Sequence, residues 1–270
     1  MKKFAILFTV VFSVCSLHSQ IASIIPSGSS IAGTSVADNQ SHTAFANPAL
    51  ISYIPKFEAG VFFENRFILS ELSTRGAQFS ITTPYVSTSF QFSYFGFNVY
   101  HDMLLGIGFA RNFAEKFALG VQFNYYSTYF SGVNTYKSAF FPQIGLNVKI
   151  TPHLNLGFST FNPFQTSIKE TLILKRIPSI FSLGTSYNFS DEFVWKFQID
   201  KEISSNFRIA TGFDYEMLNF LKVKIGTYYD DYLVMCLGTG FNFKGFIIDL
   251  NEELHPVLGL NTQATIKYRF

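Results

Sequence analysis

The sequence predicts an all-β protein: a transmembrane antiparallel β-barrel of about 14 strands with an N-terminal plug segment. Short runs of alternating apolar and polar residues recur along the chain, and a secretory leader precedes them. Aromatic residues reach 18% while charged residues reach only 14%, compared with roughly 25% charged residues in soluble domains. The net charge of +2 comes without a basic block, so no nucleic-acid partner is expected.

Residues 1–19 have the order of a signal peptide. Two lysines precede an apolar run over 4–14, and small or polar residues follow. This run is too short to span a membrane. We expect cleavage after Ser19, with Ser16 as the alternative site. Cys15 would suit a lipoprotein, but the valine before it rarely precedes a lipidated cysteine.

The alternation is clearest at the C-terminus. From Leu258 to Phe270, apolar side chains fall mostly on even positions, and polar or small ones fall on odd positions. Successive side chains of a strand point to opposite faces, so this segment has one apolar and one polar face. After the leader, no stretch approaches the ~18 consecutive apolar residues of a membrane helix. The single remaining cysteine, Cys236, cannot form an internal disulfide.

Two architectures produce such alternation, a soluble β-sandwich and a closed membrane barrel. A sandwich exposes its outer faces to water and needs many charged residues there. A barrel needs the reverse, an apolar exterior with aromatic girdles and a polar or small interior. The aromatic excess and the shortage of charges favour the barrel.

Fourteen strands are expected, with twelve as the alternative because the tenth strand and the break after the twelfth are weakly marked. The predicted ranges are 57–67, 75–83, 86–97, 102–111, 115–129, 136–150, 153–162, 178–189, 192–202, 206–215, 219–229, 232–243, 245–252 and 257–270. An even number places both termini in the periplasm of a Gram-negative cell, with the protein integral to the outer membrane. The even-numbered connections are then short periplasmic turns. The longest connection, 162–178, faces outward.

The lumen of such a barrel is too wide for the side chains of the wall to fill, so we expect another segment of the chain inside it. Fourteen strands exceed the eight that side chains alone can fill, and many inward positions are small, among them Gly120, Gly157 and Gly212. Residues 20–56 precede the first predicted strand at residue 57 and have little charge, no alternation and several apolar anchors. We therefore expect 20–56 to be a plug, with a disordered periplasmic tail as the alternative, and 57–270 to be the barrel.

Part of this segment resembles a known family. A glycine-bounded run from Gly28 to Gly33, then Asp38, then the pair Asn47 and Pro48, resembles the N-terminal hatch of the FadL-like outer-membrane β-barrel superfamily. The family's acidic pair is an Asp-Asn pair here. Because proline restricts the backbone of the residue before it, Asn47-Pro48 is interpreted as a structural hinge that links the plug to the wall, with ligand contact as the alternative.

The resemblance implies two kinds of function. Members of the superfamily include long-chain fatty-acid transporters and the PorV/PorQ-type proteins of the type IX secretion system in Bacteroidota. The terminal aromatics Tyr268 and Phe270 resemble the signal that such proteins present to the barrel-assembly machinery. The implied partners are outer-membrane lipid, that machinery, and either a hydrophobic small molecule or secretion-system proteins.

Charged residues of both signs share the inward parity, which predicts internal ion pairs that hold a plug and no selectivity filter of one sign, with a solvated, purely structural interior as the alternative. They are Glu58, Glu64, Arg66, Lys149, Lys196, Asp200, Arg208, Asp214, Lys222, Lys224, Asp249, Lys267 and Arg269.

No enzyme is expected. The histidines after the leader are scattered, no Gly-x-Ser-x-Gly motif occurs, and no His or Cys spacing suits a metal. We therefore expect no catalytic residues, no metal and no cofactor. Two functions remain: transport of small hydrophobic molecules across the outer membrane, which we favour, and a secretion-associated barrel that binds secreted proteins or other outer-membrane subunits.

Overall fold

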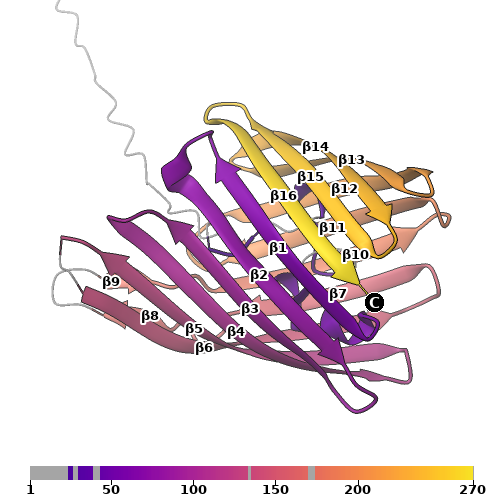
Figure 1. Ribbon diagram of the computed structural model, residues 1–270, viewed down its shortest axis with the longest axis horizontal. Coiled ribbons are helices and arrows are strands. Elements are labelled where there is room, and N and C mark those ends of the chain that lie inside the picture. The colour runs from indigo at the N-terminus through magenta and orange to yellow at the C-terminus, as the bar shows by residue number, and fades with distance from the viewer. Residues whose placement is uncertain (1–23, 27–29, 39–42, 133–134, 170–173, 270) are drawn as a thin grey trace, which may run out of the picture.

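The chain forms one closed barrel of fourteen antiparallel strands (Figure 1). The computed structural model describes residues 24–26, 30–38, 43–132, 135–169 and 174–269. The predicted signal peptide, Gly28 and Phe270 lie outside them. The barrel confirms the predicted fold class and the strand number of fourteen.

Each predicted range corresponds to one barrel strand. The observed strands extend furthest beyond the predicted ranges at the C-terminal ends of β12 and β15. The strands are β1 (Phe57–Arg66), β2 (Ser73–Thr82), β3 (Ser87–Gly96), β4 (Tyr100–Phe113), β5 (Phe117–Phe130), β6 (Thr135–Lys149), β7 (Leu154–Phe161), β10 (Ile180–Asn188), β11 (Phe193–Glu202), β12 (Phe207–Leu218), β13 (Leu221–Asp230), β14 (Tyr232–Phe243), β15 (Phe246–His255) and β16 (Gly259–Arg269). β1 pairs with β16, Glu58 opposite Arg269, and this pairing closes the wall.

The wall is polar inside and apolar outside. In β16, Gln263, Thr265 and Lys267 are buried in the lumen, while Ile266 on the opposite face is 47% exposed. The same alternation holds in β4, where the outward Ile107 is 47% exposed. This arrangement is the inverse of a soluble protein and suits a barrel whose outer face meets lipid.

The connections differ at the two ends of the barrel. At the short-turn end, tight turns such as Lys244–Gly245 join neighbouring strands, and β16 ends beside the start of β1. At the long-loop end, the connection between β7 and β10 carries a two-stranded hairpin of β8 (Ser167–Lys169) and β9 (Leu174–Arg176). The alternation did not predict these strands, because three residues are too few to show a period.

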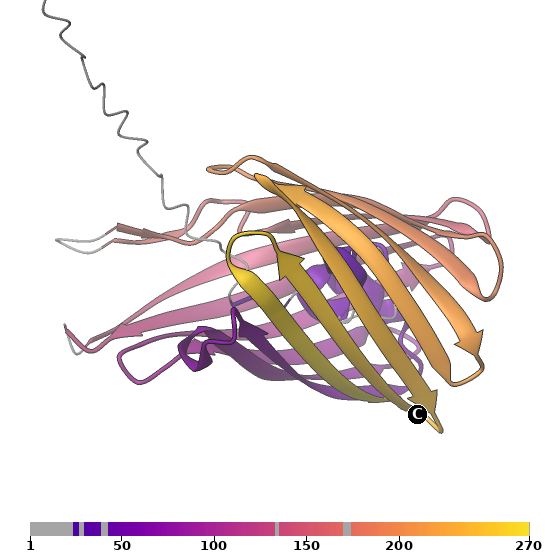
Figure 2. The same ribbon diagram turned by 90° about the horizontal axis from the view of Figure 1, so that it is seen from above.

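A plug of short helices lies within the barrel (Figure 2). It comprises η2 (Ile31–Gly33), α1 (Thr43–Ala46) and η3 (Pro48–Tyr53), and a further turn, η4 (Ser70–Leu72), lies between β1 and β2. None of the helices in the described residues is long and apolar enough to cross a membrane.

Candidate functional site

Asn47 links the plug to the barrel wall. It is fully buried, and its side chain donates to the carbonyl oxygens of Val36 (2.7 Å) and of Leu146 in β6 (3.1 Å). Its Oδ1 accepts from the backbone N–H of Ala49 at 3.0 Å and so caps η3. Pro48 follows as the first residue of that helix, where its missing N–H costs nothing.

A buried triad of charges holds the middle of the plug. The Lys196 Nζ atom of β11 lies 2.6 Å from Oδ2 of Asp38 on the plug and 2.6 Å from Oδ2 of Asp214 on β12. All three side chains are almost fully buried. A buried charge is tolerated where it is paired and hydrogen-bonded, so the triad connects the plug to two neighbouring strands.

Two further wall side chains bond the plug backbone. Arg208 of β12 donates to the carbonyl of Ala32 at 2.6 Å and pairs with Asp200 at 2.9 Å. Gln198 of β11 accepts from the N–H of Val36 at 2.9 Å. The residues around η2 are thereby attached to β11 and β12.

Inward glycines make room for the plug. A Cβ built on Gly120 would lie 2.3 Å from the carbonyl carbon of Pro48, and one on Gly157 would lie 2.2 Å from the carbonyl oxygen of Val36. Gly33, in the predicted hatch motif, has a positive φ of 64° and lies against the Arg208 guanidinium. Gly120 and Gly157 therefore lie where the plug backbone approaches the wall.

The other charges predicted to face the lumen fall into three groups. Glu58, Glu64, Arg66, Lys224, Asp249 and Lys267 are buried. Lys222 and Arg269 are partly exposed, and Arg269 pairs with Glu58. Lys149 is exposed at the short-turn end, because β6 ends there. Tyr268 packs against Phe246, with ring centroids 4.7 Å apart.

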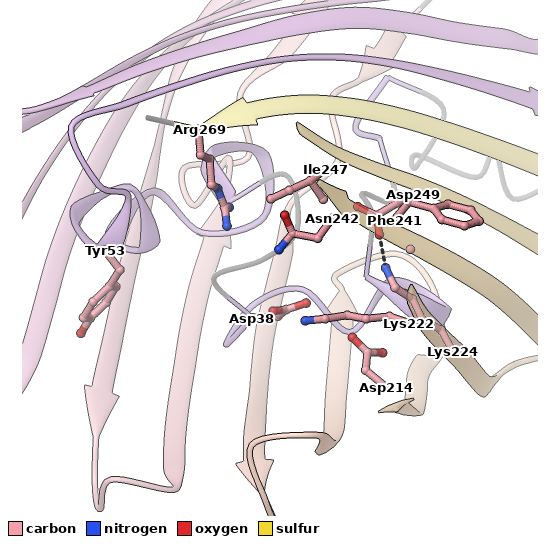
Figure 3. Close-up of a pocket in the computed structure, with 11 residues that line it drawn as sticks. Asp38, Tyr53, Asp214, Lys222, Lys224, Phe241, Asn242, Ile247, Asp249 and Arg269 are labelled. Carbon is pink, nitrogen blue, oxygen red and sulfur yellow. Dashed lines mark hydrogen bonds and ion pairs between the residues drawn. The ribbon is translucent and has the colours of Figure 1, made fainter. Parts of the chain in front are cut away.

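Below the plug, toward the short-turn end, lies a polar cavity of about 210 Å³, the lower cavity (Figure 3). Asp38 of the plug points into it toward Lys222, and Lys224 pairs with Asp249 across one side. Charges of both signs line it.

At the long-loop end lies a larger cavity of about 410 Å³, the upper cavity. Its apolar lining comes from three wall strands, from the residues before the plug and from the β7–β10 connection: Phe95, Tyr126, Phe161, Ile24 and Ile177. Ligand pockets for small molecules typically occupy ~300–1,000 Å³ and are mostly apolar with a few placed polar groups. The upper cavity therefore has the size and lining of a site for a hydrophobic molecule.

One ion pair crosses the upper cavity. Lys175 of β9 reaches Asp102 of β4, with its Nζ atom 2.6 Å from Oδ1 and 2.8 Å from Oδ2. Nζ also bonds the hydroxyls of Tyr100 and of Thr128, the latter at 3.2 Å. Burial lowers the pKa of Lys175 from its ordinary value, and Asp102 acts in the opposite direction.

Sequence reasoning missed both partners of this pair. Asp102 has the same parity as the inward Gly106 and Gly108, so its parity could have placed it in the lumen. Lys175 carried no such signal, because it lies in a three-residue strand of the connection. No cluster of three or more His, Cys, Asp or Glu side chains suited to a metal occurs in the described part of the chain.

The fold is a closed β-barrel with a plug in its lumen. Neither a family model nor a curated protein sequence matches the chain. Among solved structures, the barrel is similar to a FadL homologue of Pseudomonas aeruginosa, with a TM-score of 0.66 and 12% identity over 87% of this chain and 95% of that one. It is also similar to the toluene transporter TbuX of Ralstonia pickettii, with a TM-score of 0.65 and 11% identity over 89% and 97%. A third similar structure is the toluene transporter TodX of Pseudomonas putida, with a TM-score of 0.63 and 11% identity over 88% of this chain and 95% of that one. The chain thus has the FadL-like barrel fold.

Proposed function

We propose that this protein moves small hydrophobic molecules across the outer membrane and that the upper cavity receives them. The apolar lining of that cavity is the observation that carries the proposal. Similar barrels that are described as toluene transporters support it. No catalytic step is part of the proposal.

The proposal includes an orientation. The long-loop end, with the upper cavity, faces the outside, and the short-turn end, with the C-terminus, faces the periplasm. The short turns at that end support this choice. The predicted position of the N-terminus falls outside the described residues, and Ile24 lies in the upper cavity.

The short ladder between β6 and β7 supports a lateral exit for the cargo. β7 ends at Phe161, so its ladder with β6 covers only residues 143–149 of β6. Pro142, the next residue of β6, has no N–H to donate. Above it, the wall on this side is completed by the β7–β10 connection, from which Ile168 packs near Phe141.

The test is binding of a radiolabelled aromatic hydrocarbon to the protein in lipid nanodiscs, with empty nanodiscs as the partition control. We expect saturable binding that is lost in Phe95→Asp, because a charge would then lie in the apolar lining. Phe95→Trp, which fills the cavity without a charge, should also lower affinity. The matched control is Phe164→Asp, since Phe164 is 75% exposed in a loop. Equal binding by all four proteins would contradict the proposal.

One observation favours the second function, a secretion-associated barrel that binds secreted proteins or other outer-membrane subunits. The connections at the long-loop end expose apolar side chains, among them Ile68 (75% exposed), Phe164 (75%) and Val257 (65%). Where such side chains form a contiguous patch, they often mark a protein interaction site. Native mass spectrometry of protein purified gently from its own membrane separates the two. A bound mass of a few hundred daltons that delipidation removes supports transport, while a stoichiometric protein partner on an empty barrel supports the alternative.

A further inference from the structure

In the upper cavity, the positive charge of Lys175 is neutralised by Asp102 of the barrel wall. The Lys175 ammonium group has three N–H donors, and these meet both carboxylate oxygens of Asp102 and the hydroxyls of Tyr100 and Thr128. The Asp102 side chain is 6% exposed. Lys175 therefore has no donor left for a ligand.

A second cation of the cavity, which is buried, also pairs with a carboxylate. Arg66 lines the cavity, and its Nε atom lies 2.9 Å from Oε1 of Glu64 on the same strand. Both side chains are less than 10% exposed. Two of the three cations that line the cavity are thus each matched by a carboxylate of the barrel wall, and the third, Arg176, has an exposed side chain.

This pairing disfavours an anionic ligand at Lys175. A carboxylate that bonded Lys175 would have to displace Asp102 and leave that carboxylate buried without its partner, which is strongly unfavourable. An uncharged molecule can occupy the apolar lining and leave the pair intact.

We propose that Asp102 determines the head-group preference at Lys175 in the upper cavity: by occupying that ammonium group, it disfavours anionic amphiphiles there and favours uncharged hydrophobic molecules. This inference rests on the proposed transport function and specifies its substrate class. Asp102 acts through Lys175, and its removal should convert the site into one that accepts carboxylates.

The experiment compares decan-1-ol with decanoate, which share a chain and differ in the head group. Binding to the protein in nanodiscs is measured at pH 7.5, where free decanoate is ionised. The wild type should bind the alcohol more tightly. In Asp102→Asn, which keeps the shape and the acceptor oxygen, the preference should shift toward decanoate by about tenfold or more, because a charged hydrogen bond becomes available. Asp102→Asn with Lys175→Met should restore the preference for the alcohol.

A matched control is Glu216→Gln, which removes the carboxylate 3.4 Å from Lys222 near the short-turn end and should leave the ratio of the two affinities unchanged. If Asp102 only holds the β7–β10 connection in place, Asp102→Asn will weaken both ligands equally and the ratio will not move, which overturns the inference. A wild type that binds neither ligand nor the aromatic hydrocarbon would instead refute the transport function. Tighter binding of decanoate by the wild type would also overturn the inference while leaving transport intact.

Discussion

Individual polar side chains in the lumen attach the plug to the barrel wall. Asn47 bonds the plug to itself through Val36 and to the wall through Leu146, and its own burial is complete. A buried polar group that loses its partners costs more than the net value of its hydrogen bonds. Removing the side chain therefore leaves two carbonyl groups with fewer donors inside the barrel.

We expect Asn47→Ala to lower the free energy of unfolding by about 1–3 kcal/mol. Urea unfolding in detergent micelles measures it. Asn206→Ala is the control, because Asn206 is exposed and bonds only Asp231 in a connection. Its effect should stay within about 0.5 kcal/mol, and equal effects of the two changes would contradict the role of Asn47.

The close approach of the plug to Gly120 gives a second prediction. Gly120→Ala places a methyl group 2.3 Å from backbone carbon of the plug, and backbone cannot move as a side chain can. We expect a loss of about 1–3 kcal/mol from overpacking, measured in the same way. Gly240→Ala should cost less, because its nearest neighbour is a carboxylate oxygen of Asp249 at the end of a side chain.

At the scale of elements, Asn162 holds the described part of the β7–β10 connection in shape. Asn162 is fully buried with a positive φ of 51°. Its side chain donates to the carbonyls of Thr166 (3.0 Å) and Ile177 (2.9 Å) and accepts from the N–H of Thr166 (2.9 Å). The two arms of the connection are thereby joined close to the point where they leave the wall.

Asn162→Gly should loosen this connection, because glycine retains the positive φ but removes the three hydrogen bonds. We expect trypsin to cleave the folded protein after Arg176 at least about fivefold faster, since the local opening becomes less costly. Gln165→Gly, at an exposed residue with a φ of 54° in the same connection, is the control. A similar acceleration in both variants would show that backbone flexibility alone is responsible.

For the whole molecule, the apolar exterior predicts how the barrel responds to lipid. Ile107 faces outward from β4, between Phe90 of β3 and Phe123 of β5. If the barrel spans a bilayer as proposed, Ile107→Arg should lower the free energy of unfolding in lipid vesicles by about 2–4 kcal/mol. Ile68→Arg, in an exposed connection, should have little effect. Little effect from both changes would contradict the membrane-embedded barrel.

The fourteen barrel strands were predictable because alternation is a local property. Each strand needs only its own residues to assign one face to lipid and the other to the lumen, so the list of strands and the inward parity of Lys196, Asp214 and Lys267 followed from the sequence. The β8–β9 hairpin was not predictable, because its strands are shorter than the pattern that would reveal them.

Alternation did not predict which side chains form ion pairs across the lumen. Lys196 meets Asp38 across 158 positions of sequence, and Lys175 meets Asp102 across 73, because barrel closure and the path of the plug bring these segments together. Parity assigns a side chain to the lumen but gives neither its depth nor its neighbour. The alternation therefore determined the barrel and its polar interior, while the three-dimensional packing of plug, hairpin and wall determined the two cavities and the neutralised charge in the upper one.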